Sequence, residues 1–164
     1  MKTINAMHDF DAHFMQEAIS VAIENLEKGI GGPFGAVVVK DGEIIARCGN
    51  SVTSTNDPTA HAEVNAIREA CKVLGHFQLD DCIIYSSCEP CPMCLGAIYW
   101  ARPKALYFAA GRDDAALAGF DDSYIYNQIP LPPFNRALPT FQILQQEGLK
   151  PFQKWQAIEA KIEY

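Results

Sequence analysis

The chain has 164 residues, of which 49% are hydrophobic, and its formal net charge is -7. This length allows one domain that buries roughly 68–70% of its unfolded surface, so a hydrophobic core can form without disulfides. The acidic charge argues against nucleic acid as a partner, because binding phosphate backbones normally requires basic patches. No run approaches the ~20 apolar residues of a membrane span, so we expect no membrane association either.

Six cysteines are present, but residues 1–16 mix charged and apolar residues and do not resemble a signal peptide. We therefore expect a cytoplasmic protein with reduced thiols, not a secreted protein with three disulfides. In that setting Cys48, Cys71 and Cys82 are expected to serve as small buried hydrophobic residues.

The first half of the chain predicts one helix followed by a hairpin. Apolar residues recur at helical spacing over residues 10–28, and Gly29 is a natural end for this helix. Residues 36–40 and 43–48 are rich in β-branched residues and are separated by Asp41-Gly42, a strong signal for a two-residue turn.

A second helix is predicted from Asp57, as its cap, and Pro58, as its first residue, to a stop at Gly75. Three further elements follow: a strand, a helix and a strand over residues 82–87, 91–101 and 105–110. Strands that alternate with helices predict an α/β fold with helices on both faces of the sheet. The early hairpin makes that sheet mixed.

Four prolines within residues 127–139 predict a stiff connector, followed by a strand at 140–144 and a helix at 151–162. We therefore interpret residues 1–164 as a single domain with a connector at 127–139 to a C-terminal strand and helix. Short hinges favour the exchange of terminal elements between identical subunits. The C-terminal segment is predicted to close an active site, either its own or that of a second subunit.

Two motifs carry the chemistry: His61-Ala62-Glu63 and Pro90-Cys91-Pro92-Met93-Cys94. Together they offer three metal ligands and one carboxylate at the starts of two predicted helices. Structural zinc sites usually have four protein ligands, whereas catalytic sites supply three and leave a position for water. The pattern H-x-E…P-C-x-x-C is the signature of zinc-dependent base deaminases. It predicts one Zn2+ on His61, Cys91 and Cys94, with Glu63 moving protons for an activated water.

Cys88 leaves an alternative of another class open. With His61, Cys91 and Cys94 it would complete a structural Cys3His site in a non-catalytic, zinc-stabilised interaction module. Loss of zinc binding on Cys88→Ser would favour that interpretation.

Almost the whole chain resembles the cytidine deaminase superfamily and, within it, the small bacterial guanine deaminases. Beyond the zinc motif, the resemblance includes the segment from Gly31 to Val39 and Asn56-Asp57-Pro58-Thr59-Ala60. The zinc motif is specific to the superfamily. The stretch Ala118-Gly119-Phe120-Asp121-Asp122-Ser123 and the closing Tyr164 point to the guanine branch.

The resemblance implies a three-layer α/β/α sandwich around a five-stranded mixed sheet, usually in a homodimer. It implies hydrolytic deamination of guanine, a free purine base, to xanthine and ammonia, with Glu63 as the proton shuttle. For substrate binding it implies Asn50 as a hydrogen-bonding residue, Phe34 as a packing face, Asp122 as an acceptor, and Tyr164. A tRNA adenosine deaminase and a cytosine or nucleoside deaminase are the rival activities, because they share the zinc chemistry.

Overall fold

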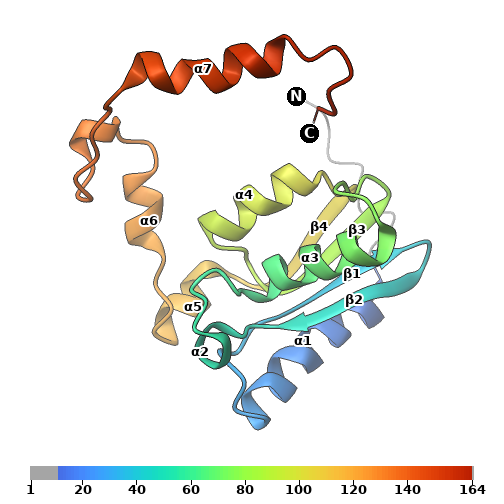
Figure 1. Ribbon diagram of the computed structural model, residues 1–164. Helices are drawn as coiled ribbons and strands as arrows, with labels where there is room; N and C mark the ends of the chain where they lie inside the picture. The colour runs from blue at the N-terminus through green and yellow to red at the C-terminus, as the bar shows by residue number, and fades with distance from the viewer. Residues whose placement is uncertain (1–10, 164) are drawn as a thin grey trace, which may run out of the picture. The chain divides into compact units, whose positions relative to one another are not determined.

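The computed structural model describes residues 11–163, and its elements are shown in Figure 1. The chain divides into two compact units, the first ending at Asp122 and the second beginning at Ser123. The first unit contains α1 (Ala12–Glu27), β1 (Gly35–Lys40), β2 (Glu43–Gly49), α2 (Val52–Thr55), α3 (Ala62–Leu74), β3 (Cys82–Cys88), α4 (Pro92–Ala101), β4 (Ala105–Ala110) and α5 (Arg112–Leu117). The second contains α6 (Ser123–Gln128), the 3-10 helix η2 (Pro133–Asn135) and α7 (Gln145–Gln156).

The predicted hairpin is confirmed between β1 and β2. Lys40 pairs with Glu43, and the two residues between them both have positive φ, 51° at Asp41 and 79° at Gly42. Two successive positive φ values are what a two-residue turn needs to match the right-handed twist of its strands, and Asp-Gly is suited to them.

The strands form a mixed sheet in the order β2-β1-β3-β4. β1 runs antiparallel to both neighbours, and β3 and β4 are parallel. Over residues 11–163 the sheet therefore has four strands, and the expected fifth is absent. The strand predicted at 140–144 is wrong: these residues are irregular, and Leu144 takes a left-handed φ of 51° as the N-cap of α7.

Helices cover both faces of the sheet, as the sequence predicts (Figure 1). Alternate residues of β1 enter two separate cores, Ala36 and Val38 on one face, Val37 and Val39 on the other. Side chains alternate between the faces of a strand, so a continuous apolar run can supply both cores. One core packs against α3 and α4, and the other against α1. This is the predicted α/β/α sandwich.

The second predicted helix begins later than expected. The carboxylate of Asp57 accepts hydrogen bonds from the Thr59 amide and hydroxyl, at 2.8 and 2.7 Å, and so makes a local turn. The N-cap of α3 is instead His61. The short helix α2 has no counterpart in the prediction, because its Val-Thr-Ser-Thr sequence has low helix propensity.

The second unit departs most from the prediction. The last helix covers Gln145–Gln156 with Pro151 inside it, whereas the prediction was a helix over 151–162. The predicted connector at 127–139 contains the end of α6 and the turn η2. Among the helices of residues 11–163, none is long and apolar enough to cross a bilayer.

Candidate active site

The three predicted metal ligands come together at the starts of two helices. His61 is the N-cap of α3, Cys91 is the N-cap of α4, and Cys94 lies in the first turn of α4. The Nδ1 atom of His61 lies 3.6 Å from the Cys91 sulfur and 3.4 Å from the Cys94 sulfur. Strand β3 ends at Cys88, shortly before this helix start. Pro92 suits the first position of α4, because an amide hydrogen at that position would have no partner within the helix.

These distances fit a zinc ion. With Zn–N of about 2.1 Å and Zn–S of about 2.3 Å, a tetrahedral angle separates nitrogen and sulfur by about 3.6 Å. Within residues 11–163, the group of His61, Cys91 and Cys94 is the metal-binding cluster, with its ligand atoms all within 4.8 Å of one another. One imidazole and two thiolates are a typical zinc ligand set, so the residues present fit this cofactor.

The electrostatics of the group already favour a thiolate. The thiol of Cys94 donates to the sulfur of Cys91, and this bond, with a further contribution from His61, lowers the pKa of Cys91 to about 4. The same interaction, together with burial, raises the pKa of Cys94. The bond to Cys91 also raises the pKa of His61. Zinc ligands must lose their protons on binding, and Cys91 is poised to do so first.

Glu63 lies in the first turn of α3, beside the metal group, and only 6% of it is exposed. Burial raises the pKa of its carboxyl group, because a charge is costly away from water. The Ser86 hydroxyl, on β3 and equally buried, donates to Oε1 of Glu63 over 3.3 Å. One carboxylate oxygen is therefore fixed by the protein.

Cys88 does not join the metal group. Its sulfur lies 3.8 Å from the carbonyl oxygen of Gly111, to which the thiol donates. Burial raises the pKa of this thiol, which disfavours the thiolate that a metal would need. The four-ligand alternative with Cys88 thus has no support in the geometry of the described residues.

Asn50 lies at the end of β2, and its side chain is held by the backbone. Its Oδ1 accepts from the amide of Gly32 at 3.3 Å and from the amide of Val52 at 3.1 Å. At Gly31 the backbone passes so close to Asn50 that an added Cβ would lie 2.2 Å from the Asn50 carbonyl oxygen. With its oxygen occupied, Asn50 offers a ligand its two amide hydrogens.

The other predicted substrate residues are less closely assembled. Phe34 packs edge-on against Phe120, with ring centroids 4.9 Å apart. Asp122 is half-buried, and its pKa is raised by burial and then by the negative charge of Cys91. Tyr164 lies outside the described residues.

An apolar groove of about 390 Å3 lies between α1, the end of β4 and α5. Ile19, Ile23 and Leu26 line one side, and Phe34 and Phe120 line another. None of the three metal ligands lines this groove, so it is distinct from the metal group.

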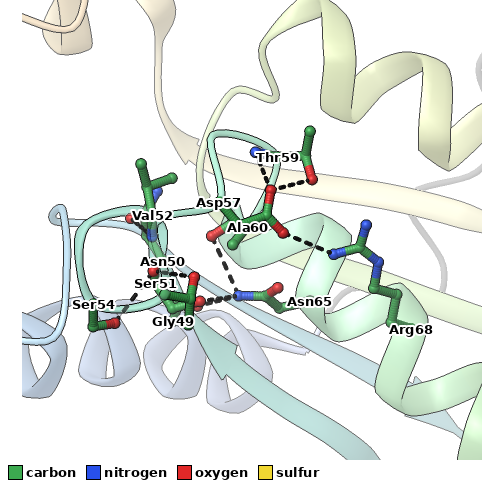
Figure 2. A network of polar contacts seen from close by, with 11 residues as sticks. Gly49, Asn50, Ser51, Val52, Ser54, Asp57, Thr59, Ala60, Asn65 and Arg68 are labelled. Atoms are coloured by element: carbon green, nitrogen blue, oxygen red, sulfur yellow. Dashed lines mark hydrogen bonds and ion pairs between the residues drawn. The ribbon is translucent and has the colours of Figure 1, made fainter.

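The sequence prediction missed Ser86, Asn25 and Asn65. A signal existed for Ser86. It lies two residues after Ile84 on the same strand and therefore on the same face, which packs against the core under α3. A polar residue buried on that face needs a hydrogen-bond partner. Asn25 and Asn65 interrupt the apolar faces of their helices in a similar way. Both donate to backbone carbonyl groups around Asn50, in the network that Figure 2 shows in part.

Comparison with known proteins agrees with this geometry. Residues 8–110 match the cytidine and deoxycytidylate deaminase zinc-binding region, and the chain belongs to this family. Guanine deaminase of Bacillus subtilis (strain 168) is 62% identical over 151 residues, which cover 92% of this chain and 97% of that protein. The X-ray structure of guanine deaminase from Bacillus subtilis superimposes with a TM-score of 0.91 at 60% identity, and the match covers 94% of this chain and 99% of that one. The tRNA-specific adenosine deaminase of Agrobacterium fabrum is 46% identical over 98 residues, 60% of this chain and 64% of that protein.

Proposed function

We propose that this protein is a zinc-dependent guanine deaminase, which catalyses the reaction of guanine with water to give xanthine and ammonia. The observation that carries the proposal is the extent of the likeness. It reaches 92% of the chain with a guanine deaminase but 60% with a tRNA-specific adenosine deaminase. The tRNA activity is therefore not favoured, and the net charge of -7 argues against it as well.

The metal would be held by His61, Cys91 and Cys94. When bound there, zinc supplies Lewis-acid activation of water near neutral pH. Glu63 supplies the proton transfers. It accepts a proton from the attacking water, delivers one to a ring nitrogen next to position 2, and assists the departure of the amino group as ammonia. Ser86 holds one of its carboxylate oxygens and so orients the group for these transfers.

Substrate recognition is assigned to polar side chains around the metal group. Asn50 donates its amide hydrogens to acceptor atoms of the base, because its own oxygen already accepts from two backbone amides. Asp122, as a carboxylate, accepts from the N–H donors of guanine. Phe34 packs against the ring plane, and Tyr164 completes the set. A wrong base would leave some of these polar groups without a hydrogen-bond partner. The cost of the missing bonds makes this kind of recognition selective.

The proposal predicts ammonia release from guanine. Purified, zinc-loaded protein is incubated separately with guanine, adenine, cytosine, cytidine and a tRNA anticodon stem-loop. Ammonia from guanine, with at most traces from the others, supports the assignment. Preference for the stem-loop would identify a tRNA deaminase, and preference for cytosine or cytidine a pyrimidine deaminase. No release from any substrate would indicate a non-catalytic zinc module.

We also propose that the protein is a homodimer whose subunits exchange the C-terminal segment that follows the connector at 127–139. The prolines of 127–139 form the hinge, and α7 presents a stripe of apolar residues at helical spacing, Leu149, Phe152 and Trp155. Leu149, Phe152 and Trp155 are 40%, 66% and 39% exposed, so the stripe is available to pack against a second subunit. Light scattering should give twice the chain mass, and a concentration-independent monomer would contradict the proposal.

A cytoplasmic location is proposed from the cysteines. None of the six cysteines is in a disulfide, and a zinc site with two thiolates is best kept in a reducing compartment.

A further inference from the structure

Asn65 makes an unusual set of contacts from the second turn of α3 (Figure 2). Its side-chain nitrogen lies 3.0 Å from the Gly49 carbonyl oxygen, 3.1 Å from the Ser51 hydroxyl and 3.3 Å from the Ala60 carbonyl oxygen. A side-chain amide has two hydrogens, so three acceptors share them. The nitrogen is thus fully engaged by the protein.

The three acceptors have a common location. Gly49 and Ser51 flank Asn50, and Ala60 immediately precedes His61. The Ser51 amide also donates to the Ala60 carbonyl oxygen, over 2.9 Å. One side chain therefore joins the segment that carries the proposed substrate amide to the residue before a metal ligand.

A second asparagine holds the same segment from the other face of the sheet. Asn25, buried on α1, donates to the carbonyl oxygens of Asn50 and Gly32, both at 2.8 Å. This contact fixes Asn50 relative to α1, which carries no metal ligand. The contacts of Asn65 differ, because α3 carries both His61 and Glu63.

We propose that Asn65 is a positioning residue that sets the placement of Asn50 relative to the metal group, and so acts on substrate binding through Asn50. This inference rests on the proposed function, in which Asn50 binds the base. A small error in such placement is costly, because binding and reaction both require the base to lie over the metal in one orientation.

The test compares Asn65→Ala and Asn65→Asp with the wild type. Both variants lose the donor, and Asn65→Asp keeps the size of the side chain. We expect KM for guanine to rise on the order of 10-fold, which corresponds to the loss of one or two directed hydrogen bonds. The zinc content should stay at one per chain, and kcat should change less than KM. The matched control is Arg68→Gln, which removes an exposed ion pair to Asp57, at 3.8 Å, in the same network and should leave KM unchanged.

A double-mutant cycle separates positioning from a general effect on stability. If Asn65 acts through Asn50, then Asn65→Ala should raise KM much less in an Asn50→Ala background than in the wild type. Additive effects, or a lower melting temperature with unchanged KM, would overturn the inference. Hydrogen exchange tests the positioning role without measuring activity. The backbone amides of 49–52 should exchange faster in Asn65→Ala than in the wild type, while those of β1 should exchange at the same rate. Inactive wild-type protein would contradict the proposed function, and unchanged exchange at 49–52 would still contradict the positioning role.

Discussion

The two units of this chain differ in how they use their apolar residues. In the first, β1 and β3 are buried between two helical layers, and side chains such as Val38 and Ile84 are fully enclosed. In the second, no residue of 123–163 is buried, and large side chains such as Phe141 and Phe152 are mostly exposed. The first unit has a core of its own, and the second lacks one.

This difference suggests that the two units have different roles. The metal ligands, Glu63 and Asn50 all lie in the unit with the rigid core, where reacting groups can be held in place. An apolar segment without a core of its own gains stability only when it covers another surface. We therefore expect the first unit to provide the chemistry, and the second to provide closure and association.

The largest expected effect lies in the first unit. Glu63→Gln keeps the shape of the side chain but removes its ability to carry protons, so turnover of guanine should fall by about 10²–10⁴-fold or more. Zinc content and melting temperature should stay close to those of the wild type. Steady-state kinetics with metal analysis checks both, and near-normal turnover would exclude this residue as the proton shuttle.

The next prediction concerns the second unit. A chain that ends at Pro151 should retain its zinc, because the ligands lie elsewhere, but should lose activity on the order of 10²-fold, because a site open to water is poorly ordered for reaction. Zinc content and ammonia release are measured on the same sample. Full activity in the shortened chain would remove any role of this segment in closing an active site.

Paired alanine substitutions measure how much each unit depends on its apolar side chains. Ile84→Ala should lower the free energy of unfolding by about 2–5 kcal/mol, because it leaves a cavity in a closed core. Phe152→Ala should change it by less than about 0.5 kcal/mol at low protein concentration, as an exposed substitution does. If the second unit packs on another subunit, the Phe152 effect should grow with protein concentration in urea titrations. Equal losses for the two variants at every concentration would contradict the contrast between the units.

A smaller effect is expected at Ser86. Ser86→Ala removes the hydrogen bond to Glu63, and kcat should fall by roughly 10-fold, the equivalent of one hydrogen bond to a charged group. KM should be unchanged, and Ser86→Thr should restore most of the activity. The matched control is Ser87→Ala, whose hydroxyl accepts from the Gly35 amide and does not contact Glu63.

The smallest effect is a pH dependence at the surface of the first unit. Arg47 and then Lys28 hold the pKa of Glu24 at about 2, below its ordinary value of 4.5. A lowered pKa stabilises the fold above pH 4.5, and this contribution is lost as the pH falls towards 2. The difference in melting temperature between wild type and Arg47→Gln should therefore shrink over that interval. Lys72→Gln, in an exposed pair with Glu69, is the control.

Much of the first unit could be predicted because its local signals agree with its tertiary structure. The Asp41-Gly42 turn, the apolar strands and the two zinc motifs each require a particular local conformation, and the fold preserves all of them. The start of α3 was the exception. Asp57 has the sequence of a helix cap, but its carboxylate is satisfied within a turn before the helix begins.

The second unit could not be predicted in this way. Residues 140–144 have the composition of a strand, but no neighbouring strand pairs with them among residues 11–163. Pro151 suits a helix start, yet it lies inside α7. Asn25 and Asn65 stand out as polar residues on apolar helix faces, but their partners could not be predicted, because the acceptors are backbone carbonyl groups distant in sequence.

A catalytic zinc ion at this site has three protein ligands, of which two are sulfur. X-ray absorption at the zinc edge of the purified, zinc-loaded protein counts these neighbours. We expect two sulfur neighbours at about 2.3 Å, with the remaining neighbours nitrogen or oxygen. Three sulfur neighbours would mean that Cys88 closes the site, and the catalytic interpretation would then be wrong.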